Sequence, residues 1–309
     1  MRVVVVGLGV QGRKRARIAL DDVVATVDPV VEDATYRGLD EVDVTSYDAV
    51  LLCVPDGVKP DLIARAIGAG KHVLVEKPLV LRESSAYDEF ERHAQRENVF
   101  IHTAYNHRFE PHIASAKRLL EERAIGDVYR CNLFYGNGTA QLVKGSAWRD
   151  TGAGVIPDLG SHLLDTVDHW FGRDLTDVNL VSAHRYENQS PDHAVLQGDE
   201  FSPNVLCEVT LLSWRNSFSA DVFGSEGSLH IRSLCKWGDS ELILRTRVRP
   251  SGRPTEERWI APEGDSTWAL EYRYFVDACQ ARTPTSLSRD ARIAAALERV
   301  AGQATGPRP

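Results

Sequence analysis

Cysteines are few in this sequence, and no two of them are close together. The five cysteines among 309 residues are at least 28 positions apart, the shortest interval being Cys207 to Cys235. An odd number at such intervals indicates neither a zinc ribbon nor a disulfide framework. We therefore expect a reduced protein of the cytoplasm.

Long apolar runs are absent as well. No stretch approaches the ~18 to 20 uninterrupted apolar residues that a membrane span requires. The N-terminus, Met1 to Gly7, carries a short apolar run without the small-residue cleavage site of a secretory signal. We expect no membrane as a partner.

Positive charge is in deficit. Lysine and arginine number 36 against 44 aspartates and glutamates, a net charge of -8 that would repel a phosphate backbone. A solvated helix face explains the longest basic cluster, Arg13 to Arg17, at least as well as a nucleic-acid patch does, and we expect nucleic acid not to be a partner. With 43% hydrophobic and 26% charged residues, the length predicts a folded protein of two domains.

The first third of the chain alternates nearly continuous apolar runs with helical patterns, which is typical of a parallel sheet covered by helices on both faces. The predicted strands are 3–6, 23–27, 49–54, 72–75 and 99–103, and the predicted helices are 11–20, 58–69 and 84–98. The stretch 28–47 is too short for a further helix and strand. We predict an α/β fold, a doubly wound parallel sheet of the Rossmann type over residues 1–108, trimmed on its adenosine side.

After residue 108 the pattern changes to alternating strands, which predicts an α+β domain with a mostly antiparallel sheet over residues 109–309. The predicted strands are 127–135, 178–185, 205–214, 217–223, 228–231 and 241–248, and the predicted helices are 111–123, 159–171, 267–280 and 288–301.

A glycine-rich turn follows the first predicted strand and opens a helix. Gly7, Gly9 and Gly12 have the spacing that lets a backbone turn tightly, approach a pyrophosphate and pack against a strand. Asp28 closes the second strand, where a carboxylate accepts hydrogen bonds from a ribose. We predict a dinucleotide site that also includes Val10 and Gln11. The alternative is a structural glycine turn with a strand-end aspartate.

The charges after Asp28 bear on the choice of dinucleotide. Glu32 and Asp33 follow it, and no lysine or arginine lies within 29–33 to receive a 2′-phosphate. Repulsion from three carboxylates favours NAD over NADP, and NADP is not excluded.

Lys77 follows the predicted strand 72–75, within Glu76-Lys77-Pro78. Ligands bind beyond the carboxyl ends of strands in open parallel sheets, so its ammonium is predicted to hold a substrate oxygen. The alternative is an ordinary surface lysine.

Asp158 and His162 are four residues apart at a predicted helix start, so the carboxylate can orient the imidazole for proton transfer. Two alternatives stay open. Asp158 can be a helix cap with His162 in a packed core, or Asp158, His162, Asp165 and His169 can bind a metal; we predict no metal.

These elements together resemble the glucose-fructose oxidoreductase / inositol dehydrogenase / rhizopine catabolism (Gfo/Idh/MocA) family. The resemblance covers essentially the whole chain and rests on Gly7 to Gly12, Glu76-Lys77-Pro78, Tyr105 to Phe109 with Pro111, Ala124 to Val128, and Asp158 with His162. It implies a second domain for substrate binding whose open sheet often forms the interface of a homodimer or homotetramer. One departure is Lys59, where the family often has a histidine.

The resemblance also implies roles for individual residues. Lys77 and His162 would contact the reacting carbinol, with Asp158 beside them. Glu76 would lie near the nicotinamide, and Val54 and Pro55 near the cofactor.

The stretch 135–149 precedes the Asp158 helix and is a candidate lining of the substrate pocket. Trp148 offers a stacking face and Arg149 a bidentate donor, and we add Arg108 as a third substrate contact. A plain loop with a packed tryptophan is the alternative.

The sequence thus predicts an NAD(P)-dependent oxidoreductase acting on a small-molecule secondary alcohol or ketone of a sugar, polyol or nucleotide sugar. Two alternatives remain: a non-catalytic dinucleotide-binding regulator of the same fold, and an enzyme of the same kind acting on a non-sugar substrate.

Overall fold

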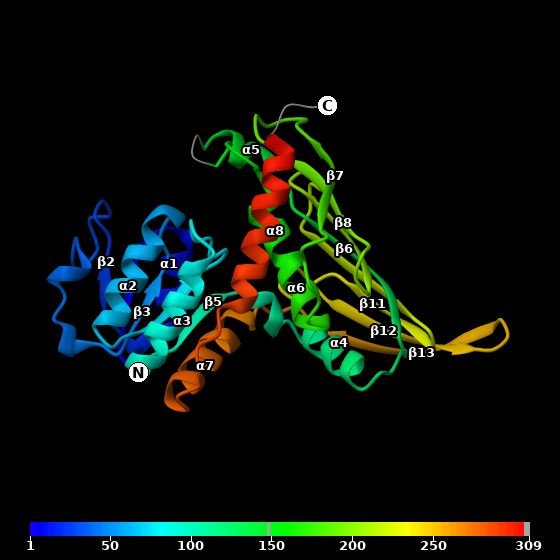
Figure 1. The fold of residues 1–309 in the computed structure, drawn as a ribbon, viewed down its shortest axis with the longest axis horizontal. Coiled ribbons are helices and arrows are strands. Elements are labelled where there is room, and N and C mark those ends of the chain that lie inside the picture. The colour runs from blue at the N-terminus through cyan, green and yellow to red at the C-terminus, as the bar shows by residue number, and fades with distance from the viewer. Residues whose placement is uncertain (147–148, 306–309) are drawn as a thin grey trace. The chain divides into compact units, whose positions relative to one another are not determined.

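The computed structural model describes residues 1–146 and 149–305, which form two compact units (Figure 1). The first unit contains residues 1–106 and 267–294, and the second contains 107–266 with the described residues from Ala295 onward. The sequence placed everything after residue 108 in one domain, whereas 267–294 packs with the first unit. Within the described residues, no helix is both long and apolar enough to cross a bilayer.

The first unit is a five-stranded, wholly parallel sheet in the order β2-β1-β3-β4-β5, which confirms the predicted fold. Its strands are β1 (Val3–Val6), β2 (Val23–Val27), β3 (Ala49–Leu52), β4 (His72–Glu76) and β5 (Ile101–Ala104). Its first three helices are α1 (Val10–Ala19), α2 (Lys59–Gly68) and α3 (Ser85–Glu97). As predicted, the stretch between β2 and β3 adds no sixth strand; it contains the short 3-10 turns Leu39–Glu41 and Val44–Ser46.

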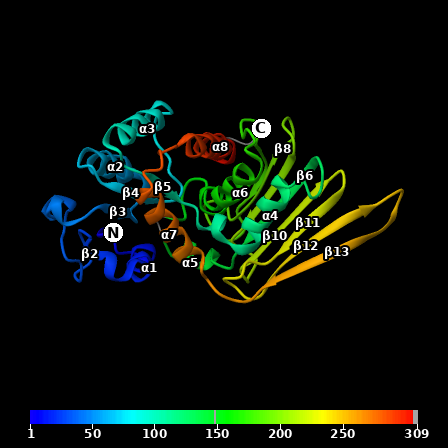
Figure 2. The ribbon, with the colours of Figure 1, turned by 90° about the horizontal axis from the view of Figure 1, so that it is seen from below.

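Both faces of this sheet are covered, which explains why its strands read as continuous apolar runs. Val4 and Val6 pack on the face that carries α2 and α3, and Val3 and Val5 on the opposite face. That opposite face is covered by α1 and by α7 (Thr267–Gln280), as Figure 2 shows. Phe275 of α7 is fully buried. Residues 267–280 therefore belong to this unit because they complete its second layer.

The second unit is an eight-stranded sheet in the order β13-β12-β11-β10-β6-β9-β8-β7. Within the described residues β6 and β9 run parallel and the other neighbouring strands of this sheet run antiparallel, so the prediction of a mostly antiparallel sheet is confirmed. Its strands are β6 (Val128–Gly136), β7 (Asn179–His184), β8 (His193–Gly198), β9 (Asn204–Thr210), β10 (Ser217–Gly224), β11 (Gly227–Arg232), β12 (Ser240–Val248) and β13 (Gly252–Ala261).

Helices cover one face of this second sheet. Figure 2 shows α4 (Pro111–Glu121) and α6 (Ser161–Phe171) along it, and alternate residues of β6 and β10 are buried beneath. Two further helices are α5 (Ala140–Lys144), which is short, and α8 (Ser288–Thr305).

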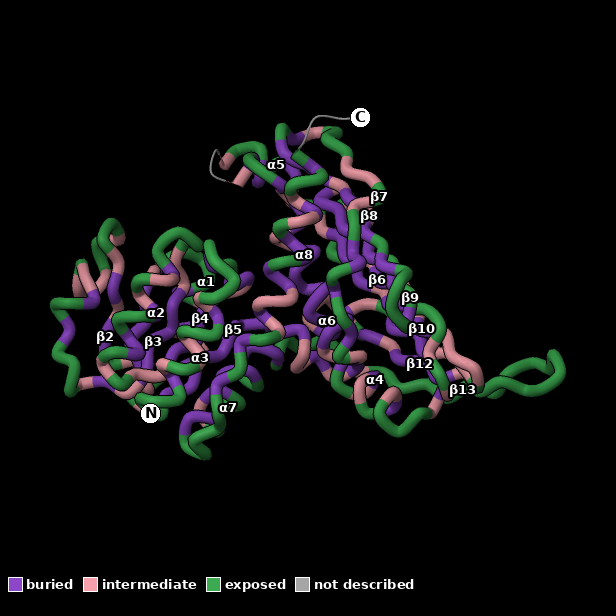
Figure 3. Tube along the Cα trace, in the orientation of Figure 1, coloured by how far each residue is buried: buried purple, intermediate pink, exposed green. Residues whose placement is uncertain are grey.

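The strands β8 and β13 were not predicted from the sequence. Nine of the ten residues of β13 are exposed (Figure 3). This strand therefore lacks the alternation of buried and exposed residues by which the predicted strands of this sheet were recognised.

Candidate functional site

The glycine turn after β1 is built as the dinucleotide pattern requires. Gly7 has φ +89°, and a Cβ on it would lie 2.4 Å from the Cys53 carbonyl oxygen. A Cβ on Gly12 would lie 1.7 Å from the Gly7 carbonyl oxygen, so both glycines are needed for the turn itself. Gly9 differs, because a Cβ there would meet nothing within 4 Å. It precedes the first turn of α1, whose backbone N–H groups have no partner inside the helix, so this open space suits an anion.

The neighbouring predicted cofactor residues lie at the carboxyl edge of the same sheet. Val10 and Gln11 open α1 with exposed side chains, 84% exposed for Val10. Val54, half-buried, and Pro55, exposed, come directly after β3. An apolar group exposed beside the turn is available for contact with a ligand.

Asp28 follows β2, and its carboxylate is hydrogen-bonded to the backbone of the glycine turn. Its Oδ2 accepts a hydrogen bond from the Leu8 N–H at 2.8 Å, and its Oδ1 accepts from the N–H groups of Val30 and Val31 at 2.9 and 3.0 Å. Burial would raise the pKa of Asp28, but these donors outweigh it and the pKa lies below the ordinary aspartate value. The carboxylate is therefore ionised and keeps lone pairs for a ribose hydroxyl.

Two arginines near Asp28 modify the charge that the sequence indicated there. The Arg13 guanidinium holds Asp33 in a bidentate pair at 2.9 and 3.0 Å. Arg37 donates to the Val31 carbonyl oxygen at 2.7 Å, and its charge helps to lower the pKa of Asp28. The expected repulsion from three carboxylates is thus partly neutralised by side chains from outside 29–33.

Lys77 lies immediately beyond the carboxyl end of β4, where the sequence placed it, and is half-buried. The Glu76 carboxylate before it accepts a hydrogen bond from Arg15 Nε at 2.8 Å, and Arg15 also pairs with Glu271 of α7 at 2.7 Å. The side chain of Arg15 is 1% exposed. The solvated helix face that was one explanation of the Arg13 to Arg17 cluster therefore does not include Arg15, because this side chain is buried between two carboxylates.

In the second unit, His162 lies in the first turn of α6 and is 7% exposed. Its ring stacks on that of His107, with centroids 4.1 Å apart, and meets Tyr135 edge-on at 5.9 Å. Lys236 Nζ lies 2.9 Å from His107 Nε2. Because an ammonium only donates, Nε2 of His107 is the acceptor of this hydrogen bond.

Sequence reasoning missed His107 and Tyr135 as neighbours of His162, and Lys236 as the partner of His107. His107 lies within the motif from Tyr105 to Phe109, which gave a local signal. Tyr135 comes from β6 and Lys236 from the turn after β11, and nothing in their local sequence marks them.

The other predicted residues of this unit are held by ion pairs. Asp158 Oδ2 lies 3.4 Å from Arg149 Nη2, and the expected hydrogen bond from His162 to Asp158 stays a prediction. Arg108 Nε donates to both oxygens of the fully buried Asp165, at 2.9 and 3.1 Å. Trp148 lies outside the described residues. In residues 1–146 and 149–305 no three His, Cys, Asp or Glu side chains are grouped to hold a metal ion.

Comparison with known proteins identifies related sequences over both units. A family model described as "Oxidoreductase family, NAD-binding Rossmann fold" matches residues 1–105, and one described as "GFO/IDH/MocA C-terminal domain" matches residues 113–230. The fold resembles that of levoglucosan dehydrogenase in complex with NADH, with a TM-score of 0.81 and 18% identity over 98% of this chain and 96% of that one.

Two dehydrogenases of Bacillus subtilis are similar in sequence. One is scyllo-inositol 2-dehydrogenase (NAD(+)), 27% identical over 199 residues, which are 60% of this chain and 56% of the relative. The other is scyllo-inositol 2-dehydrogenase (NADP(+)), 26% identical over 151 residues, 48% and 41% of the two chains. The matched region thus spans less than two thirds of either relative.

Proposed function

Because the chain belongs to the GFO/IDH/MocA family of oxidoreductases, we propose that it is an NAD(P)-dependent dehydrogenase or reductase. It transfers a hydride between a nicotinamide and the secondary alcohol or ketone of a sugar, a polyol or a nucleotide sugar. The observation that carries this proposal is the glycine turn whose open side lies at Gly9, beside the N-terminus of α1. The names of the inositol and levoglucosan dehydrogenases support the substrate class.

The residues at the carboxyl edge of the parallel sheet fit a dinucleotide. The space at Gly9 and the first amides of α1 would hold the pyrophosphate, and Asp28 the ribose hydroxyls. The backbone of Glu76 would lie near the nicotinamide, and Val54 and Pro55 would lie near the cofactor. When bound, the nicotinamide supplies the carbon that accepts or gives the hydride.

In this proposal the catalytic residues handle the proton and the charge on oxygen. His162 accepts the proton of the substrate hydroxyl, and the Lys77 ammonium donates a hydrogen bond to the same oxygen as it becomes an alkoxide. Asp158 orients and polarises His162, and in the reductive direction the roles reverse. Arg108, Arg149 and Trp148 contact other groups of the substrate.

The proposal includes an oligomeric state and a cellular compartment. The expected oligomeric state is a homodimer or a homotetramer. The five cysteines, all within the described residues, are free thiols, which supports the reducing cytoplasm as the compartment.

The experiment that tests the function is a panel of sugars, polyols and nucleotide sugars assayed with NAD and with NADP, following reduced nicotinamide by absorbance. Turnover of at least one carbinol supports the dehydrogenase. Cofactor binding without turnover on this panel, followed by turnover of an enone or an aromatic dihydrodiol, would select the non-sugar substrate. Cofactor binding without any turnover would favour the regulator.

Substitution of Gly9 by alanine is expected to weaken NADH binding without destabilising the fold. The added methyl group meets no protein atom within 4 Å, so it occupies only the space left for the pyrophosphate. The dissociation constant measured by fluorescence titration should rise at least about tenfold, or about 1.4 kcal/mol. Gly68→Ala, equally free of neighbours on α2, is the control, and equal NADH binding by both variants would contradict the assigned site.

The wild-type protein is expected to bind NADH more tightly than NADPH, because Asp28 is ionised where a 2′-phosphate would approach. Asp33→Ser releases the guanidinium of Arg13 from its carboxylate partner and should reduce the ratio of the NADPH to the NADH dissociation constant. Titration of each variant with both dinucleotides measures this ratio. Asp40→Ser, which breaks the exposed pair with Arg65, is the control, and tighter binding of NADPH by the wild type would overturn the preference.

A further inference from the structure

Lys59 is buried in the first unit, although it is a lysine at the start of a helix. It opens α2, and its side chain is 2% exposed. Its Nζ lies 2.6 Å from the carbonyl oxygen of Glu76, 2.8 Å from that of Pro78 and 2.6 Å from Asp56 Oδ1. An ammonium has three N–H donors, so all three are used.

The two carbonyl groups that Lys59 binds are those on either side of Lys77. The backbone is therefore tied to one ammonium just before and just after the residue proposed to contact the reacting oxygen. Arg15 in addition holds the Glu76 carboxylate, with its Nε 2.8 Å from Oε1. Two buried cations from α2 and α1 thus fix the segment from which the Lys77 side chain starts.

An apolar residue at position 59 would fill the space of Lys59 without the cost of burying a charge. That cost is visible: burial lowers the pKa of the Lys59 ammonium, and Asp56 opposes the shift. Without the ammonium, however, the carbonyl groups of Glu76 and Pro78 would lose their hydrogen-bond donor and would have to rotate toward another one. Such a rotation would displace the backbone of Lys77. The charged group of Lys59 therefore keeps this backbone segment in place.

We propose that Lys59 is a positioning residue for the hydride-transfer reaction, which holds the Glu76 to Pro78 turn and thereby places the Lys77 ammonium. This rests on the proposed function. Displacement of a reacting group by about 1 Å costs on the order of 100-fold in rate. Of the proposed cofactor contacts, the backbone of Glu76 lies in this turn, whereas the glycine turn and Asp28, which would hold the pyrophosphate and the ribose, follow β1 and β2. Loss of Lys59 should therefore lower kcat and leave NADH binding nearly unchanged.

The test compares Lys59→Met, Lys59→Gln and Lys59→Arg with the wild type on a substrate that the wild type turns over. Lys59→Met should lower kcat about 10- to 100-fold, with the KM for substrate and the Kd for NADH within about threefold of wild type. Lys59→Arg, which keeps N–H donors at this position, should recover a large part of the kcat lost in Lys59→Met. If Lys59→Met does not fold, Lys59→Gln replaces it in the comparison. Lys71→Met is the matched control, because Lys71 also donates to a main-chain carbonyl, that of Tyr47 at 2.8 Å.

Amide hydrogen exchange of residues 76–81 in the same variants tests, without any substrate, whether Lys59 holds the backbone from Glu76 to Pro78. Lys59→Met should speed exchange of this segment at least about tenfold, and Lys71→Met should leave it unchanged. A kcat for Lys59→Met within about threefold of wild type, or unchanged exchange in 76–81, would overturn the proposal. If the wild type turns over no substrate, the proposed function fails, while the exchange result still decides whether Lys59 holds the turn.

Discussion

His162→Asn is expected to lower kcat by about 10²- to 10⁴-fold, the range that general acid–base catalysis contributes. An amide of similar size can stack on His107 but cannot take up and release a proton near neutral pH. The effect should fall on kcat and kcat/KM together, since the proton moves only in the transition state. Steady-state kinetics with the best substrate of the panel, and an NADH titration, measure it.

A matched buried histidine separates the loss of chemistry from the loss of structure. His112 of α4 is 4% exposed in the same unit, and its Nε2 lies 3.1 Å from the Ser240 carbonyl oxygen. His112→Asn should keep kcat within about threefold of wild type. Lys77→Met should lose about 10²- to 10³-fold, as expected when a donor to the reacting oxygen is removed. Full turnover by His162→Asn would remove this residue from the mechanism.

The parallel sheet could be predicted because each of its strands carries its signal within its own few residues. Residues of β1 and β3 are buried whichever face they point to, so the runs 3–6 and 49–52 are apolar without interruption. The glycine turn, Asp28 and the Glu76-Lys77-Pro78 segment were also recognisable, because each is a short motif next to such a strand.

What escaped prediction depends on partners far along the chain. Arg15 looked like its neighbours Arg13 and Arg17, and only its partners Glu76, 61 positions away, and Glu271 of α7 distinguish it as buried. Lys59 gave no sign that two carbonyl oxygens would surround it. The placement of residues 267–280 was missed for a similar reason: a helix pattern shows which face is apolar but not which sheet receives it.

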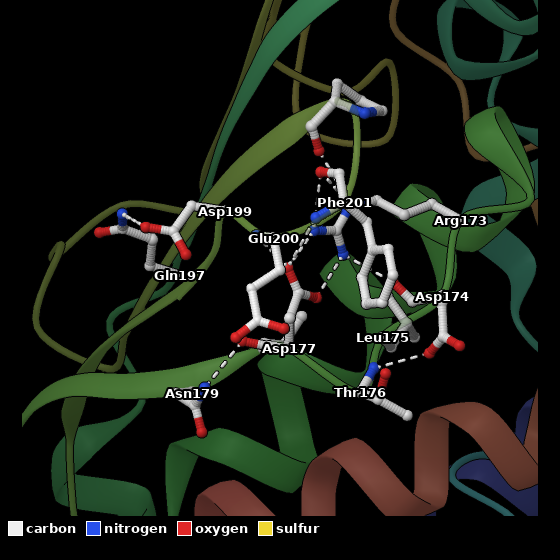
Figure 4. A network of polar contacts seen from close by, with 12 residues as sticks. Arg173, Asp174, Leu175, Thr176, Asp177, Asn179, Gln197, Asp199, Glu200 and Phe201 are labelled. Atoms are coloured by element: carbon white, nitrogen blue, oxygen red, sulfur yellow. Dashed lines mark hydrogen bonds and ion pairs between the residues drawn. The ribbon is translucent and has the colours of Figure 1, made fainter.

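Asp177→Asn is expected to destabilise the second unit by about 3–5 kcal/mol, the range for breaking a buried ion pair. Asp177 and Arg173 are 0% and 1% exposed, and the Arg173 Nη1 and Nη2 atoms lie 2.9 and 2.5 Å from the two carboxylate oxygens (Figure 4). Asp177 also accepts from the Glu200 N–H at 2.9 Å, while Arg173 Nε donates to the Pro203 carbonyl oxygen. The pair thus ties the connection after α6 to the turn between β8 and β9, and the amide would leave the guanidinium without its counter-charge.

Acid weakens the same interaction, and the sign follows from the pKa. Burial would raise the pKa of Asp177, but hydrogen bonds from Arg173 and its charge lower it below the ordinary 3.8. The stabilisation is therefore present above 3.8 and is lost as the pH falls through the lower pKa of the folded state. Urea unfolding at several pH values should show the wild type and Asp177→Asn converging in strong acid. Glu122→Gln, which breaks an exposed pair with Arg118, should cost less than about 1 kcal/mol; an equally small loss for Asp177→Asn would show that this buried pair does not hold the unit together.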